Sequence, residues 1–152
     1  MSLDFSGRVA IVTGAGGGLG REHALALAKR GAKVVVNDFG GARDGTGGSV
    51  SAAQAVVDEI RAAGGEAIAN SASVTDFEAV QAMVQNTMDI WGRIDILINN
   101  AGILRDKSFA KMELEDFRMV LEVHLMGSVN CCKAVWPIMV AQNYGRIMMT
   151  TS

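Results

Sequence analysis

Short apolar runs alternate along this chain with longer stretches in which apolar residues recur at helical spacing. The first run, Arg8 to Thr13, is rich in β-branched residues and lacks alternating polar positions, which is typical of a parallel strand covered on both faces. Four further runs resemble it: Val34 to Asp38, Glu66 to Asn70, Ile94 to Ile98 and Gly145 to Ser152. The alternation predicts one α/β domain over residues 1–152, a doubly wound, three-layer Rossmann-like fold with a parallel sheet in the strand order 3-2-1-4-5.

Two of the predicted helices carry specific expectations. Thr75 and Glu78 fit a capping box, in which Thr75 reaches forward and Glu78 reaches back, for a helix through Ile90 or Trp91. Glu113 to Val140 forms one long helical stretch, in which we expect a bend at Pro137.

This long stretch is apolar on two sides. This pattern predicts that one apolar face packs on the sheet and that the other packs on a second subunit, as in a homodimer or homotetramer. The first stripe comprises Phe117, Val120, Leu121, His124, Ser128, Cys131, Cys132 and Val135, and the opposite side carries Leu125, Val129 and Trp136.

A glycine-rich turn, Thr13-Gly14-x-x-x-Gly18-x-Gly20, lies between the first strand and the first helix. Glycines there let backbone approach a pyrophosphate, and the helix that begins at Leu19 directs free N–H groups and a positive dipole end toward it. The turn therefore predicts a dinucleotide site, although a tight strand-to-helix turn without a ligand is the alternative. The candidate contacts in the turn are Thr13, Gly14, Gly16, Gly18, Leu19 and Gly20, with Gly16 and Gly17 also readable as conformational slack.

Asp38 ends the second strand, where a carboxylate can accept hydrogen bonds from both adenosine ribose hydroxyls. A 2′-phosphate would meet a like charge there, so the residue favours NAD as the cofactor. The glycine-rich segment 39–48 that follows is either a loop beside the adenosine site or a surface insertion.

Composition narrows the function classes. The chain has 152 residues, of which 49% are hydrophobic and 20% charged, and a formal net charge of −2, so it is a globular type without a basic block for nucleic acid. Apolar runs are short and the amino terminus lacks a secretory pattern, which predicts no membrane span and a cytoplasmic location. Cys131 and Cys132 are adjacent on a helix, so we expect free thiols and no metal site.

The chain resembles the short-chain dehydrogenase/reductase family along its whole length. The glycine turn, Asn99-Asn100-Ala101-Gly102 and the strand ending Thr151-Ser152 occur in the order and spacing of that family. Within it, Asn37 to Gly41, Ile103 to Asp106 and Val123-His124-Leu125 are similar to the (3R)-hydroxyacyl-CoA dehydrogenase branch, found in peroxisomal multifunctional enzymes and bacterial single-domain relatives.

The resemblance implies hydride transfer between NAD and a secondary alcohol or ketone, with 3-hydroxyacyl-CoA as the expected substrate class. Ser152 matches the serine that holds the substrate oxygen, and Asn100, with Ala101 and Gly102, would line the nicotinamide side. Asn100 has a plain alternative as a turn asparagine. Ser73 and Val74 would flank the adenine.

His124 occupies the position at which the family has an asparagine that orders a water for proton relay. Two interpretations stay open. His124 relays protons, or it is a polar group on the sheet-facing stripe whose hydrogen bonds go to backbone.

The tyrosine and lysine of the family's active site would follow Ser152, so we expect the 152 residues to be an inactive part of a longer chain. A phenol is a poor base at neutral pH without a nearby cation, which is the role of that lysine. Two other functions remain open: a non-catalytic NAD-binding module, or a dehydrogenase of steroids, sugars or other carbonyl compounds. A eukaryotic source would make a peroxisomal location possible.

Overall fold

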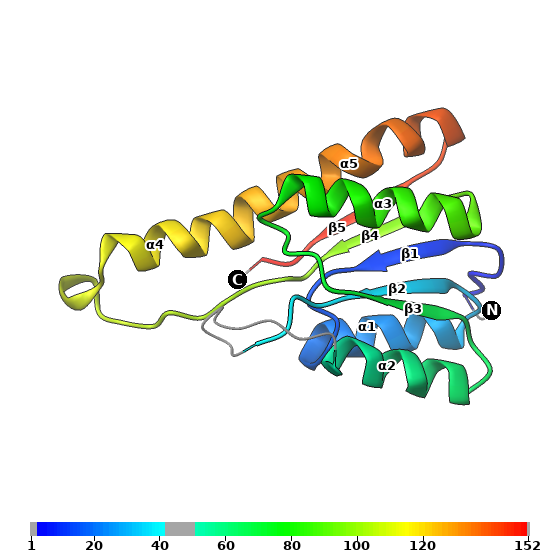
Figure 1. Cartoon of the computed structure of the whole chain (residues 1–152), viewed down its shortest axis with the longest axis horizontal. Helices are drawn as coiled ribbons and strands as arrows, with labels where there is room; N and C mark the ends of the chain where they lie inside the picture. The colour runs from blue at the N-terminus through cyan, green and yellow to red at the C-terminus, as the bar shows by residue number, and fades with distance from the viewer. Residues whose placement is uncertain (1–2, 42–50, 152) are drawn as a thin grey trace.

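The computed structural model of the chain describes residues 3–41 and 51–151. The five strands form one parallel sheet in the order β3-β2-β1-β4-β5, which confirms the predicted topology. Figure 1 shows α1 and α2 on one face of this sheet and α3 and α5 on the other. The strands are β1 (Val9–Val12), β2 (Lys33–Asn37), β3 (Ala67–Asn70), β4 (Ile96–Asn99) and β5 (Arg146–Met149), and the helices are α1 (Gly18–Lys29), α2 (Ser51–Ala62), α3 (Phe77–Trp91), η1 (Phe109–Lys111), α4 (Leu114–Leu121), η2 (Glu122–Met126) and α5 (Gly127–Gln142).

The central strands are apolar on both sides because each side of the sheet has its own core. Ile11 is paired with Val35 and Leu97 in the parallel register, and all three face the layer of α3 and α5. The alternate residues, such as Ala10 and Val34, pack toward α1 and α2. This register brings the carboxyl ends of the strands to one edge of the sheet.

Helix α3 begins one residue later than the capping box predicts. Asp76 is its N-cap, and the Asp76 carboxylate accepts a hydrogen bond of 3.1 Å from the backbone N–H of Ala79. The Thr75 hydroxyl instead lies 2.8 Å from the hydroxyl of Ser73. The capping-box prediction is wrong because aspartate caps a helix as well as threonine does, and the adjacent residue takes the role.

The long helical stretch departs from α geometry at η2, one turn of π-helix, and not at the proline. Helix α5 continues through Pro137 to Gln142. The interruption of α geometry therefore falls around His124, where an extra residue is accommodated in the turn, and a bend of the helix axis at Pro137 stays a prediction.

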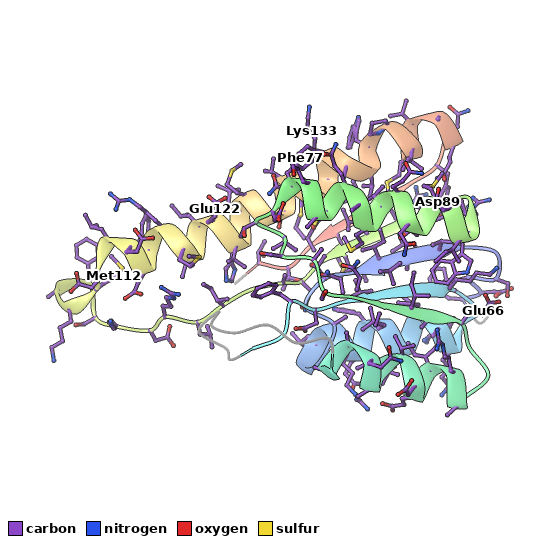
Figure 2. The ribbon with its side chains drawn as sticks, in the orientation of Figure 1. Glu66, Phe77, Asp89, Met112, Glu122 and Lys133 are labelled. Carbon is purple, nitrogen blue, oxygen red and sulfur yellow. The ribbon has the colours of Figure 1, made fainter. Side chains whose placement is uncertain are left out.

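Only the second half of this stretch packs on the sheet. Cys131 and Val135 of α5 are buried, whereas no residue of α4 is buried. Figure 2 shows Met112 at the far end of the segment that projects beyond the sheet. The predicted sheet-facing stripe is therefore wrong for Phe117 and Leu121, which are exposed because α4 lies past the edge that would cover them.

The opposite side of the stretch is exposed as well. Leu125 is 57%, Val129 44% and Trp136 60% exposed.

None of the helices in the described residues is long and apolar enough to cross a membrane.

Asp95 fastens the amino-terminal edge of the sheet. Its carboxylate is inaccessible to solvent and accepts hydrogen bonds from Arg93, from Arg8 and from the backbone N–H of Val9. Burial by itself raises the pKa of Asp95, but these three donors outweigh it and hold the pKa below its usual range. The guanidinium of Arg8 also lies 3.7 Å from the ring centre of Tyr144, which precedes β5.

Candidate functional site

The glycine turn lies at the carboxyl end of β1 and packs against the residues that follow β4. Gly14 has a φ of +61°, a left-handed conformation that favours glycine, and a Cβ there would lie 2.8 Å from the Cα of Ala101. A Cβ on Gly20 would lie 2.5 Å from the Asn100 amide nitrogen and would collide with the Gly14 carbonyl. Two predicted site segments, the turn and Asn100–Ala101, are therefore in direct contact.

Thr13 joins these two segments by hydrogen bonds. Its hydroxyl oxygen accepts from the backbone N–H groups of Asn100 and Ala101, each at 3.0 Å. The same hydroxyl donates to the carbonyl of Ile98 at 3.4 Å. Thr13 thus holds the glycine turn against the segment that follows β4.

The Asn100 side chain completes this link from the other direction. Its amide nitrogen donates to the carbonyl oxygens of Thr13, at 3.2 Å, and Gly14, at 3.1 Å. Asn100 is therefore more than a turn residue, because it fixes the backbone on both sides of the first glycine. Its place beside a nicotinamide ring stays a prediction.

Asp38 lies against the glycine turn. One carboxylate oxygen accepts a hydrogen bond of 2.8 Å from the backbone N–H of Gly16, and the other accepts one of 2.7 Å from that of Gly40. A Cβ on Gly16 would lie 2.8 Å from the carboxylate, whereas Gly17 has open space around it. Gly16 is thus required by its contact with Asp38, and the interpretation as conformational slack fits Gly17 alone.

The amino end of α1 is suited to an anion. Its N-cap is Gly17, which offers no capping side chain, and its first turn contains no acidic residue. Gly18 has a φ of +54°, and the exposed side chain of Leu19 leaves the turn toward solvent. Because the first N–H groups of a helix lack partners within the helix, this end can hold a phosphate.

Ser73 and Val74 follow β3 at the same edge of the sheet. Val74 is buried against Gly127, where a Cβ would lie 2.5 Å from a Val74 methyl group. Asn130 of α5 donates a hydrogen bond of 2.9 Å to the Val74 carbonyl. The segment is held in place by α5, and its contact with adenine stays a prediction.

His124 lies in the π-helical turn and reaches the segment after β4. Its Nε2 atom is 3.0 Å from both the backbone nitrogen and the backbone oxygen of Ile103, so it accepts or donates according to the tautomer. The ring also lies so close to Gly102 that a Cβ there would be 2.7 Å from Cε1. The backbone-bonded interpretation describes this contact, although His124 is exposed; proton relay stays a prediction.

Ser152 lies outside the described residues, as does segment 42–50, which holds most of the glycine-rich loop after Asp38. The strand that leads to Ser152 is described as far as Thr151. The backbone N–H of Thr150 donates to the Asn99 carbonyl at 3.0 Å, so β5 ends beside the segment that carries Asn100.

The apolar pattern assigns no role to two buried asparagines at this edge. Asn37 ends β2 and Asn99 ends β4, and both are buried. The Asn99 amide lies 3.5 Å from the Cys132 sulfur and 3.2 Å from the Met149 sulfur, which links β4 to α5 and β5. Each asparagine is the polar residue that ends an apolar run, and this position is the sequence signal that could have identified both.

The thiols do not extend the site. Cys131 and Cys132 are free, and burial raises the pKa of Cys131 to about 12, which keeps this thiol protonated. Among the described residues no group of three or more histidine, cysteine, aspartate or glutamate side chains is placed to hold a metal ion.

Comparison with known proteins identifies close relatives. The family profile described as short chain dehydrogenase matches residues 8–152. The chain is 57% identical to peroxisomal multifunctional enzyme type 2 of Drosophila melanogaster over 150 residues, which is 99% of this chain and 25% of that protein. It is 47% identical to a 3-oxoacyl-[acyl-carrier-protein] reductase of Synechocystis, covering 95% of this chain and 56% of the reductase.

Solved structures agree with the fold. A 7α-hydroxysteroid dehydrogenase in complex with NADH and 7-oxo glycochenodeoxycholic acid superposes with a TM-score of 0.87 at 36% identity, covering 98% of this chain and 55% of that one. The chain thus spans from a quarter to just over half the length of these relatives.

Proposed function

This chain belongs to the short chain dehydrogenase family, and from that premise we propose that it carries the NAD site of an oxidoreductase. The enzyme would transfer a hydride between the nicotinamide and a secondary alcohol or ketone, most suitably a 3-hydroxyacyl-CoA. When bound, NAD supplies the hydride acceptor, and the residues of this chain bind and orient it.

The carboxylate of Asp38 is the observation that carries the choice of NAD over NADP. It lies beside the glycine turn, held by the N–H groups of Gly16 and Gly40. A carboxylate at this place accepts hydrogen bonds from ribose hydroxyls and repels a 2′-phosphate.

The residues present fit a dinucleotide. Nothing lies within 4 Å of the Cβ positions of Gly17 and Gly18, so the turn offers bare backbone to a pyrophosphate at the point where α1 begins. In this proposal Ser73 and Val74 flank the adenine, and Asn100, Ala101 and Gly102 border the nicotinamide.

Two residues of this chain are proposed for the chemical step. Ser152 would hold the substrate oxygen, and His124, anchored to Ile103 through Nε2, would take up and release a proton at its other ring nitrogen, Nδ1. The acid/base itself is expected from the rest of the family's active site.

The substrate proposal rests on likeness to the hydroxyacyl-CoA branch, and the steroid dehydrogenase among the structural neighbours supplies the competing class. The test compares kcat/KM of the full-length protein for a 3-hydroxyacyl-CoA, for a 3-hydroxyacyl group on acyl carrier protein and for a steroid alcohol. We expect the acyl-CoA to be preferred, and a preference for the steroid alcohol would contradict the proposal.

The cofactor proposal has its own test. Asp38→Ala in the full-length protein should raise the KM for NAD and reduce the preference for NAD over NADP by about tenfold or more, because the repulsion of a 2′-phosphate is lost. An unchanged preference would mean that Asp38 does not contact the ribose. Tight NAD binding without turnover of any of the three alcohols would instead favour a non-catalytic NAD-binding module.

For the location, we propose the cytoplasm, or the peroxisome in a eukaryote. Relatives named as peroxisomal enzymes support the second location for a eukaryotic source. Fluorescence microscopy of the tagged full-length protein would distinguish the two compartments.

A further inference from the structure

A buried asparagine, Asn37, connects the parts of the site that lie on the adenosine side. Its side chain is 1% exposed, and its amide nitrogen donates to the Asn70 side-chain oxygen at 2.9 Å and to the Ala72 carbonyl at 3.0 Å. The Asn70 oxygen also accepts from the backbone N–H of Ala72 at 2.9 Å. One amide therefore joins the end of β2 to the chain leaving β3.

The backbone of the same two asparagines holds the other side of the site. The N–H of Ala15, inside the glycine turn, donates to the Asn37 carbonyl at 2.8 Å. The N–H of Asp38 donates to the Asn70 carbonyl at 3.0 Å. Displacing Asn37 would therefore move the turn, the Asp38 backbone and the residues after β3 relative to one another.

The residues after β3 are anchored at both ends. At one end Asn37 and Asn70 fix Ala72, and at the other Asn130 bonds the carbonyl of Val74. Losing the bonds at Ala72 would leave segment 72–74 held only from α3, through the Ser73 carbonyl, and from α5, through the Val74 carbonyl. Since Ser73 and Val74 are the proposed adenine contacts, the Asn37 anchor determines how far these two residues lie from Asp38.

The environment of Asn37 would accept an apolar residue. It follows the buried Val34, Val35 and Val36 in β2, and burying an amide costs free energy unless its hydrogen bonds are made. A valine would continue the strand without this cost, so the amide's stabilising role lies in the contacts it makes beyond the strand.

We propose that Asn37 is a positioning residue for the adenosine half of the dinucleotide, acting through Asn70 and Ala72 to set the spacing between Asp38 and segment 72–74. The inference rests on the proposed function for the identity of the ligand. It deepens that proposal by adding a positioning residue that touches no ligand.

The main test uses Asn37→Val in the full-length protein. The KM for NAD and the dissociation constant for ADP-ribose should each rise by about tenfold, which corresponds to the loss of one or two buried hydrogen bonds. The kcat and the binding of nicotinamide mononucleotide should stay unchanged, because the far half of the site is held by Thr13 and Asn100.

Thr87→Val is the matched control. Thr87 is fully buried in α3 and donates one hydrogen bond of 2.8 Å to Met83, so its loss destabilises the fold without touching the site. This variant should reduce thermal stability and leave KM and ADP-ribose binding as in the unmodified protein. If both variants raise KM equally, or if Asn37→Val changes neither KM nor ADP-ribose affinity, the proposal is overturned.

A second readout separates this inference from the proposed function. Amide hydrogen exchange at Ala72 and Ala15 should accelerate about tenfold or more in Asn37→Ser, a smaller variant that keeps a polar group, while Ile11 in the centre of β1 stays protected. Unchanged exchange at Ala72 would overturn the positioning role whatever the ligand. Failure of the unmodified protein to bind NAD, together with faster exchange in the variant, would instead reject the proposed function and keep the anchor.

Discussion

The backbone N–H of Gly16 donates a hydrogen bond of 2.8 Å to a carboxylate oxygen of Asp38, 22 positions further along the chain. This bond links the turn proposed for the pyrophosphate to the acid proposed for the ribose. The orientation of the acid therefore depends on a residue that must lack a side chain.

Gly16→Ala should consequently weaken NAD binding. The new methyl group would lie 2.8 Å from the Asp38 carboxylate and 2.9 Å from the Cβ of Ala52, and both are too close for an ordinary contact. We expect the dissociation constant for NAD, measured by titration calorimetry on the full-length protein, to rise by about tenfold. Gly64→Ala is the control, because nothing lies within 4 Å of its Cβ position and it precedes β3, away from the carboxyl ends of the strands; equal effects of the two substitutions on NAD binding would contradict the explanation.

His124 and Gly102 should show a strong coupling. Gly102→Ala places a Cβ 2.7 Å from the His124 ring and should destabilise the fold by about 1–3 kcal/mol. Combining it with His124→Ala removes the collision, so the double variant should be more stable than the sum of the two single effects by about 1 kcal/mol. Denaturant unfolding of all four proteins measures this cycle, and additive effects would show that the ring leaves the glycine in solution.

Asp95 predicts a defined pH dependence of stability. Its pKa in the folded chain lies below the usual value, so the unfolded chain takes up the proton first as the pH falls. Its stabilisation is complete above about pH 4 and declines as the pH falls below that value through the folded pKa. Asp95→Asn should cost about 3 kcal/mol at pH 7, since it leaves Arg93 and Arg8 without their carboxylate, and the cost should shrink in acid.

The control for Asp95→Asn is Asp89→Asn, on the exposed surface of α3, where the carboxylate accepts one hydrogen bond from Gln85. It should change the free energy of unfolding by less than about 0.5 kcal/mol across the pH range. If the difference between the unmodified protein and Asp95→Asn stays constant from pH 7 to pH 2, the ionised state of Asp95 is not what stabilises the edge.

The exposed side of η2 and α5 predicts self-association of the full-length protein. Leu125, Val129 and Trp136 are 44–60% exposed, and covering the exposed half of such a side chain contributes about 1 kcal/mol. Val129→Glu should therefore lower the sedimenting mass toward that of a monomer. Lys29→Gln, in α1 on the other face of the sheet, is the control that also changes the net charge by one unit, and a monomeric unmodified protein would reject the prediction.

The fold could be predicted from the sequence because its three central strands, β1, β2 and β4, are buried on both faces. Runs such as Val9 to Val12 contain no polar residue that could face solvent, and this pattern alone fixes them as central parallel strands. The strand order followed because the glycine turn and Asp38 identify the first two strands of a nucleotide-binding unit.

The sequence singled out the glycine turn and Asp38 as candidate site residues. It did not predict the hydrogen bonds that hold these residues in place. The Thr13 and Asn100 bonds depend on which atoms meet when β1 and β4 become neighbours, and no local pattern encodes that meeting. The π-helical turn at His124 was missed for a similar reason, since Pro137 is the visible helix breaker while the interruption at His124 carries no such residue.

The contact of the glycine turn with Asn100 and Ala101 has a thermodynamic consequence. Fixing the backbone of one residue costs about 1–2 kcal/mol of conformational entropy, and here Thr13 and Asn100 have already fixed it during folding. A ligand that binds at this turn does not have to order its backbone. The free energy of binding is therefore not reduced by that conformational entropy cost. The entropy loss on binding should then arise from the ligand and from the surrounding loops, with little contribution from the turn itself.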